Sequence, residues 1–123
     1  MLQIIFNEIS ASELSKLPNQ TQFTLLEALN IQPEDVENRT LEKRFGVIAK
    51  GQTSLYRCRA GDFRIYFAVE GANVKIHRVL HKNTLKDFLF RSNLGGAVED
   101  EALRESKGFW KLIEEGERTL KMV

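Results

Sequence analysis

The sequence has 123 residues, 42% hydrophobic and 28% charged, a composition that fits one globular domain and excludes a wholly disordered chain. No apolar run reaches the roughly 18 residues needed to cross a bilayer, and "MLQIIFNEIS" lacks the basic start of a secretory signal. One Cys and two His are too few for a four-ligand zinc site, so we expect no metal or other cofactor. The single Cys58 also excludes an internal disulfide and suits a reducing compartment, so we expect a cytoplasmic protein without membrane contact.

Charge is distributed unevenly, although the formal net charge is only +1. Residues 1–38 carry one Lys against six Asp or Glu, a net −5, and residues 92–123 carry five basic against seven acidic residues, a net −2. Residues 39–91 carry twelve Lys or Arg against four acidic residues, a net +8. A basic middle of this kind attracts phosphates through its local field.

The N-terminal part predicts a strand followed by a helical hairpin. "LQIIFNEI" is short and rich in Ile, which indicates a buried strand at about 2–7. A helix capped by Ser10 or Ser12 should run through Leu17, because Pro18 interrupts it, and a second helix should end near Asn30. Residues 32–53 have no clean period and are expected to form a loop with at most one helical turn.

From residue 54 the period changes to that of strands. Runs of β-favouring residues separated by "GD" and "GA" predict an antiparallel meander at 54–60, 63–70 and 73–80. A helix capped near Asn83 or Thr84 should follow and end before Gly95-Gly96. Apolar residues recur at helical spacing between 98 and 120, with a break expected near Gly108.

The segment "LYRCRAGDFRIYF", residues 55–67, predicts a hairpin that turns at Gly61-Asp62. Its register places Arg59 opposite Arg64 and Arg57 opposite Tyr66. These four side chains then share one face, and the other face is a core face that carries Tyr56, Cys58, Phe63, Ile65 and Phe67. Opposed arginines repel each other unless a carboxylate or a bound anion lies between them. The face therefore suits phosphate contact with base stacking, and the alternative is an exposed face with nothing bound.

A turn at Gly71-Ala72 extends this pattern into the third strand. It places His77 opposite Tyr66, Val79 opposite Arg64, and His81 at the end of the same face, while Val74, Ile76 and Leu80 join the apolar side. Arg78 falls on the apolar side in this register, which indicates a bulge or a frayed strand.

The succession of a strand, a helical hairpin, "YRCRAGDFRIYFAV", "VKIHRVLHK" and a helix resembles the RelE/ParE toxin superfamily over about residues 1–91. The resemblance implies an α+β fold with the N-terminal strand and helical hairpin packed on a twisted antiparallel sheet, to which C-terminal helices are added. It further implies a RelE-like toxin of a type II toxin–antitoxin system, a ribosome-dependent endoribonuclease that cleaves mRNA, or a weakened relative. Its expected partners are mRNA on the ribosome and an antitoxin protein. The alternative is a ParE-like or non-catalytic module that binds gyrase, an antitoxin or RNA without cleavage.

The resemblance also assigns roles to individual residues. Arg59, Arg64 and His81 match the positions that stabilise the transition state and transfer protons. The wider set expected to contact nucleic acid comprises Arg57, Arg59, Arg64, Tyr66, His77, Lys82 and Lys86. Phe88 stands where nuclease members often have a catalytic tyrosine, and a phenyl ring cannot exchange a proton. Whether the chain is an enzyme is therefore left open at this stage.

The last thirty residues extend beyond the resemblance. We expect residues 1–94 to form the RelE/ParE-like domain and residues 95–123 to form a helical extension. Phe109, Trp110 and Ile113 lie close together in this extension and predict a helix packed on the domain or on a second copy, as in a homodimer. A third reading makes the acidic tail an intramolecular shield for the basic face.

Overall fold

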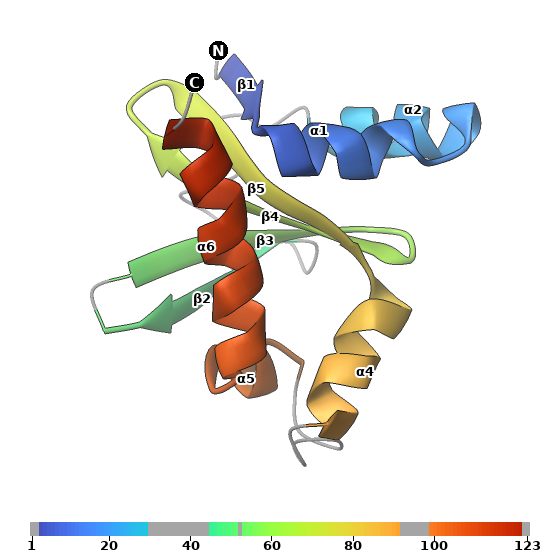
Figure 1. The fold of residues 1–123 in the computed structure, drawn as a ribbon. Helices are drawn as coiled ribbons and strands as arrows, with labels where there is room; N and C mark the ends of the chain where they lie inside the picture. Colours follow the sequence, from blue (N-terminus) through green and yellow to red (C-terminus); the bar gives the residue numbers. More distant parts are fainter. Residues whose placement is uncertain (1–2, 30–44, 52, 92–98, 122–123) are drawn as a thin grey trace.

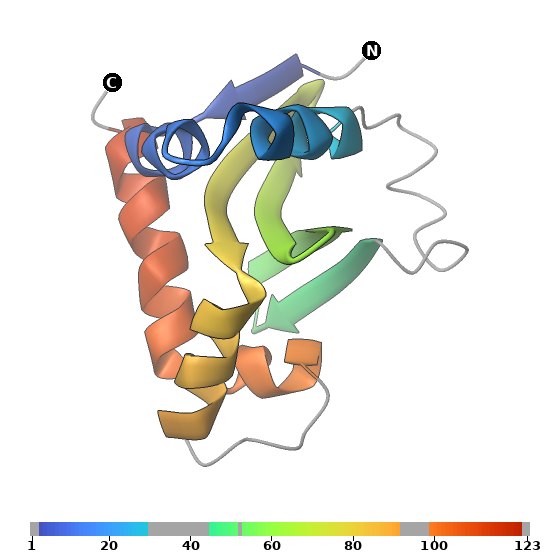
Figure 2. The same ribbon diagram turned by 90° about the vertical axis from the view of Figure 1, so that its right-hand side faces the viewer.

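The computed structural model describes residues 3–29, 45–51, 53–91 and 99–121. The strands, in chain order, are β1 (Gln3–Phe6), β2 (Phe45–Lys50), β3 (Thr53–Ala60), β4 (Phe63–Glu70) and β5 (Asn73–His81). The helices are α1 (Glu8–Ser15), α2 (Asn19–Ala28), α4 (Lys82–Arg91), α5 (Glu99–Arg104) and α6 (Lys107–Lys121). Figure 1 shows α6 crossing the strands, and Figure 2 shows the same ribbon from the side.

The strands form one five-stranded sheet in the order β1-β5-β4-β3-β2, so the expected α+β class is confirmed. The sheet is mixed, since β1 pairs parallel with β5 and the other neighbours are antiparallel. Strands β3, β4 and β5 form the expected antiparallel meander, and β1 joins it as a parallel edge strand. A parallel pair needs a long crossover, and here the crossover from β1 to β5 contains α1, α2 and the other three strands.

One strand lies where the sequence predicted a loop. The segment "FGVIAK" forms β2 at the edge of the sheet and pairs with β3 from Phe45↔Cys58 to Lys50↔Thr53. Gly46 and the order of apolar and polar residues in this segment give no clear alternation, so the strand forms because its backbone pairs with β3. The C-terminal part of the expected loop at 32–53 is therefore corrected to a strand, and residues 30–44 lie outside the described part of the chain.

The β3–β4 hairpin has the predicted register. Arg59 pairs with Arg64 and Arg57 pairs with Tyr66 across a turn at Gly61-Asp62. Gly61 adopts a φ of 59°, a left-handed conformation that a residue with a Cβ rarely takes. This local turn chemistry is sufficient to set the hairpin register, because the turn fixes which residues face each other.

The β4–β5 pair follows the predicted register only from its turn to Phe67↔Ile76. A register shift then places Arg78 opposite Tyr66 and Leu80 opposite Arg64, and it leaves His77 at the irregularity. The expected pairing of Tyr66 with His77 is therefore wrong. The expected pairing of Arg64 with Val79 is wrong for the same reason, and the bulge indicated by Arg78 is present.

The bulge is held by side chains from α1. Asn7 Nδ2 donates to the carbonyl oxygens of Ile76 (3.2 Å) and His77 (3.0 Å), and Ser10 Oγ donates to the Ile76 oxygen at 2.9 Å. Asn7 also accepts from the Ser10 backbone N–H at 2.7 Å in a capping box that begins α1. Asn7 is thus the N-cap instead of Ser10 or Ser12. Its side-chain oxygen accepts from a backbone N–H of α1, and its side-chain nitrogen donates to carbonyl oxygens of β5.

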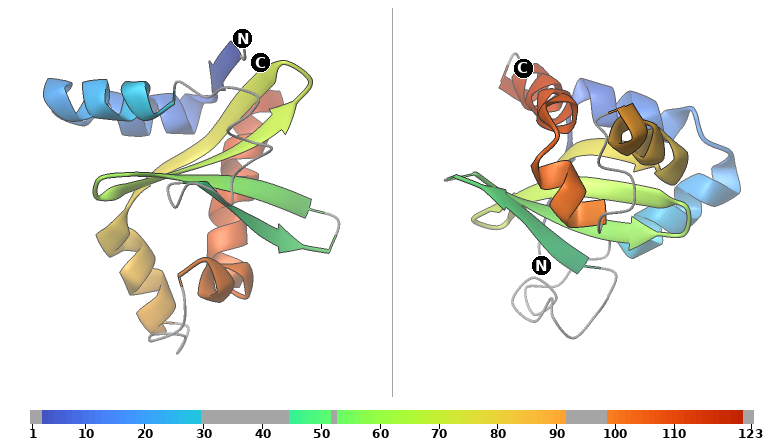
Figure 3. Two further views of the ribbon diagram at one scale, coloured as in Figure 1. Left: turned by 180° about the vertical axis from the view of Figure 1, so that it is seen from behind. Right: turned by 90° about the horizontal axis from the view of Figure 1, so that it is seen from below.

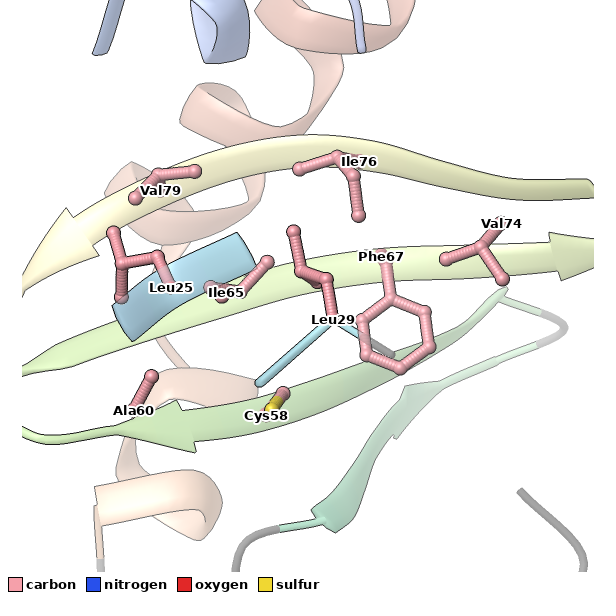
Figure 4. Packing of buried hydrophobic residues seen from close by; sticks show 9 residues of the cluster. All are labelled: Leu25, Leu29, Cys58, Ala60, Ile65, Phe67, Val74, Ile76 and Val79. Atoms are coloured by element: carbon pink, nitrogen blue, oxygen red, sulfur yellow. The ribbon is translucent and has the colours of Figure 1, made fainter. Parts of the chain in front are cut away.

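The sheet has a hydrophobic core on each face. The first, shown in Figure 4, lies between the sheet and α2 and comprises Leu25, Leu29, Cys58, Ala60, Ile65, Phe67, Val74, Ile76 and Val79. The second lies beneath α4, α5 and α6 and comprises Ile48, Leu55, Tyr66, Leu80, Leu85, Ala102, Leu103, Phe109 and Ile113. The two clusters alternate along β3 and β4, as the pleat requires. Leu80 belongs to the second core, which corrects its predicted place beside Ile76.

The C-terminal segment forms two helices, with the break two residues earlier than expected. α5 ends at Arg104 and α6 begins at Lys107, so Gly108 lies inside α6. Ser106 Oγ accepts a hydrogen bond from the Phe109 backbone N–H at 3.2 Å and caps α6. Figure 3 shows from behind and from below that α5 and α6 lie against one face of the sheet.

Candidate nucleic-acid interface

Arg59 and Arg64 face each other near the turn of the β3–β4 hairpin, and both side chains are half-buried. Arg64 Nη1 donates to the backbone oxygens of Gly61 and Phe63, each at 3.1 Å. These bonds hold the guanidinium against the hairpin turn. Two positive groups are thus kept together at one end of the sheet, which is an arrangement that an anion stabilises.

Arg57 and Tyr66 lie on the same sheet face as this pair, but both side chains are buried. Arg57 is 5% exposed and Tyr66 is fully buried. The Tyr66 ring contacts the Phe109 ring edge to face, with centroids 4.9 Å apart. In this conformation neither side chain is available for base stacking or phosphate contact, so the predicted site is divided into a covered part and an open end.

Neither histidine lies where the predicted register placed it. His77 is 7% exposed and lies at the irregularity of β5, where its backbone oxygen accepts from Asn7. His81 pairs with Phe63, so it belongs to the opposite face from Arg59 and Arg64, and its ring contacts Phe63 edge to face at 5.0 Å. The predicted placement of His81 at the end of the arginine face is therefore wrong, since one extra residue reverses the faces.

His81 has a structural task at the start of α4. Its Nδ1 accepts a hydrogen bond from the Asn83 backbone N–H at 3.0 Å. The expected cap by Asn83 or Thr84 is thus supplied by the imidazole, and α4 begins at Lys82. A neutral imidazole whose Nδ1 accepts carries its proton on Nε2, so it has no second lone pair with which to act as a base. General base catalysis by His81 would require this cap to break.

Lys82 is paired with the hairpin turn. Its Nζ lies 3.1 Å from Asp62 Oδ1, and its backbone N–H donates to the Asp62 oxygen at 2.8 Å. The hydrogen bond and the charge of the Lys82 ammonium lower the pKa of the Asp62 carboxyl. Asp62, predicted only as a turn residue, thus partly neutralises the cations near the turn of the β3–β4 hairpin. A carboxylate within a basic motif was the signal that could have identified it.

The remaining predicted residues are Lys86 and Phe88 of α4. Lys86 is exposed, one turn beyond Lys82, and the side chain of Phe88 lies outside the described part of the structure. Within the described residues, no group of three or more His, Cys, Asp or Glu side chains gathers where a metal ion could be held. No helix in that part of the chain is long and apolar enough to cross a membrane.

Comparison with known proteins finds a similarity among solved structures. No family model matches the sequence, and no curated protein matches it. Among solved structures, the chain is similar to the archaeal RelE–RelB complex from Pyrococcus horikoshii OT3, with 23% identity and a TM-score of 0.47. The match covers 66% of this chain and 94% of the other chain.

Proposed function

We propose that this chain is a RelE-like protein of the toxin–antitoxin type that binds RNA through Arg59 and Arg64 with little or no cleavage. The observation that carries the proposal is the opposed arginine pair at the open end of the β3–β4 hairpin, beside Lys82 and Lys86. Opposed guanidiniums repel in water and are stabilised by phosphate, which each can contact through two N–H groups.

Three features argue for binding over catalysis. Tyr66 is buried against Phe109 of α6, and Arg57 is only 5% exposed. His81 lies on the other face, and its Nδ1 accepts the Asn83 backbone N–H near the start of α4. Phe88 stands at the position where nuclease members often have a proton-transferring tyrosine. With neither His81 nor Phe88 able to serve there as the base, deprotonation of a 2′-hydroxyl would lack the 10²–10⁴-fold assistance, in order of magnitude, that a positioned base gives.

The test is induced expression of the full chain, with ribosome co-sedimentation and mapping of mRNA ends. We expect co-sedimentation that weakens with salt, and mRNA that stays intact. Arg59→Ala/Arg64→Ala should lower the slope of log affinity against log salt by about 1.4, near 0.7 per lost phosphate contact. The matched control Lys16→Ala/Arg104→Ala removes two exposed cations from other parts of the surface and should bind as the native chain does. Equal binding by both double variants would refute the proposal.

The second candidate is an active endoribonuclease, and the alignment of Arg59 with Arg64 favours it because both could stabilise a phosphorane. Translation-dependent mRNA cleavage that disappears in Arg59→Ala/Arg64→Ala would establish it. His81→Asn then separates the two tasks of the histidine, since an amide oxygen can still cap α4 but cannot transfer a proton. Growth arrest with intact mRNA and DNA damage would instead indicate a gyrase-directed, ParE-like protein.

We also propose an antitoxin-like partner that covers an exposed apolar patch on α2. Phe23 is 71% exposed and Leu26 is 49% exposed, and they lie one turn apart on that helix. The apolar face of a partner helix would bury the Phe23 ring and the Leu26 methyl groups. A small reading frame beside the gene should encode a protein that co-purifies with this chain, and Phe23→Ser/Leu26→Ser should abolish co-purification.

A homodimer contact through α6 stays a prediction. Phe109 and Ile113 of this helix are buried against this chain's own sheet.

A further inference from the structure

A cavity of about 640 Å³ lies between α6 and the end of β2, apart from the opposed arginines. Four cations line it, together with one carboxylate and the chain's single tryptophan: Lys50, Lys107, Lys111, Arg118, Glu114 and Trp110. We call this the α6–β2 cavity. Its volume lies in the range of sites that hold small ligands or short polymer segments. Figure 1 shows α6 crossing in front of β3 near β2.

The cations are arranged in a line along α6. Lys107, Lys111 and Arg118 lie within about 40° of each other around the helix axis, at about 100° per residue. All three are exposed, as is Lys50 on the facing strand. Among the described residues, none of these four cations has an ion-pair partner. A row of exposed cations facing a fourth one creates a positive potential along the cavity, which Glu114 reduces only in part.

Trp110 adds a flat apolar surface beside this row. Its indole Nε1 donates to the Arg104 backbone oxygen at 2.8 Å, and its ring contacts Phe109 edge to face at 5.5 Å. These contacts fix the orientation of the ring, which is only half-buried. An immobilised aromatic ring next to a line of cations is the combination with which proteins bind single-stranded nucleic acid, since a base stacks on the ring and phosphates pair with the cations.

We propose that the α6–β2 cavity binds a short single-stranded RNA segment, with one base stacked on Trp110 and backbone phosphates at Lys107, Lys111 and Lys50. Apart from Lys50, the site is formed by residues beyond the RelE-like part of the chain, and it does not depend on the function proposed for Arg59 and Arg64. Glu114 limits the affinity, because its charge repels the phosphates that the neighbouring cations attract.

The single tryptophan makes the site directly observable. An unlabelled oligouridylate is titrated into the full-length protein while the fluorescence of Trp110 is recorded, because a stacked base quenches an indole. We expect saturable quenching whose midpoint rises with salt. Lys107→Gln/Lys111→Gln should weaken binding at least tenfold and lower the salt slope by about 1.4. Glu114→Gln should strengthen binding, and Lys16→Gln should not change it.

The contribution of stacking is measured with a labelled oligouridylate and Trp110→Leu, which keeps an apolar side chain against Phe109. Loss of one stacking contact should weaken binding by roughly five-fold to a hundred-fold. Arg59→Ala/Arg64→Ala should retain the Trp110 quenching, so failure of this proposal and failure of the RNA-binding function proposed above are distinguishable.

Three results would overturn the proposal. The first is absence of quenching by the oligouridylate, and the second is equal affinity of Lys107→Gln/Lys111→Gln and the native protein. The third is equally tight binding of double-stranded RNA or inorganic polyphosphate, which would show attraction by charge alone. Tighter binding of an acidic peptide than of the oligouridylate would assign the cavity to a protein partner and likewise refute it.

Discussion

Gly116 of α6 lies directly against the bulge of β5, and its replacement by Ala gives a sharp test of how α6 is seated. A Cβ at this position would meet the backbone oxygen of His77 and would lie 2.8 Å from Asn7 Nδ2. The His77 oxygen is backbone and is already held by the Asn7 amide at 3.0 Å, so it cannot rotate away as a side-chain end would. Accommodation therefore requires α6 to move away from the sheet.

Two effects of opposite sign decide the result. Ala is about 1 kcal/mol more favourable than Gly in the interior of a helix. Overpacking at a closely packed contact costs typically about 1–3 kcal/mol, and here both the His77 oxygen and the Asn7 amide nitrogen are involved. We expect the packing effect to prevail, so that Gly116→Ala lowers the free energy of unfolding by up to about 2 kcal/mol. For a chain of this length that corresponds to a decrease of up to about 8 °C in Tm.

Thermal and urea unfolding followed by circular dichroism measure the change. Ser12→Ala on the exposed side of α1 is the matched control, because it also replaces a weaker helix former by Ala but meets no neighbouring element. That variant should be as stable as the native protein or slightly more stable. A Tm for Gly116→Ala equal to or above the native value would refute the close seating of α6 on the bulge.

Three further predictions concern the contacts that position α1, β5 and the hairpin turn. Asn7→Ala should lower the free energy of unfolding by about 2–4 kcal/mol in urea melts, because it removes the cap of α1 and a buried donor to the carbonyl oxygens of Ile76 and His77. Arg78→Met should lower the free energy of unfolding by about 2–4 kcal/mol, because the mostly buried Glu13 then loses the guanidinium that lies 2.7 Å from its carboxylate. A double-mutant cycle with Glu13→Gln should show strong coupling between the two residues, and additive effects would contradict the pairing. Asp62→Asn should remove a pH-dependent part of stability: the lowered pKa of Asp62 beside Lys82 stabilises the fold above the ordinary Asp pKa, about 4, and this stabilisation is lost as pH falls through the lowered pKa. Thermal melts of Asp62→Asn and the native chain between pH 2 and 7 should therefore converge at the acid end.

Much of the β3–β4 hairpin could be read from the sequence, because its determinants are local. Gly61 can adopt a left-handed conformation, and the alternation of Arg57, Cys58 and Arg59 assigns faces through the pleat alone. Cys58 is fully buried in the first core, as this alternation requires. The two-helix C-terminal segment was readable for the same reason, since helical period depends only on residues a few positions apart.

The bulge in β5 could not be located in the same way. The sequence indicated a bulge only because Arg78 fell on the apolar face of the predicted strand. The position of the bulge depends on Asn7 and Ser10, about seventy residues away, whose side chains donate hydrogen bonds to the carbonyl oxygens of Ile76 and His77. This single irregularity removed the expected pairing of His77 with Tyr66 and moved His81 to the opposite face of the sheet. The sequence could not show it, because a change of register is decided by contacts between distant segments.

The sequence by itself determined that this chain carries a hairpin with opposed arginines, a basic middle between acidic flanks, and a row of cations along its last helix. Each follows from local chemistry: turn residues, strand alternation and helical spacing. The tertiary structure alone decided which of these groups can meet a ligand. Because Phe109 and Leu103 bury the sheet face in a second core, Arg57 and Tyr66 are covered, while Arg59, Arg64 and the α6–β2 cavity stay at its margins. Burial is a property of segments brought together by folding, so the same motif can be a binding face in one chain and part of a core in another.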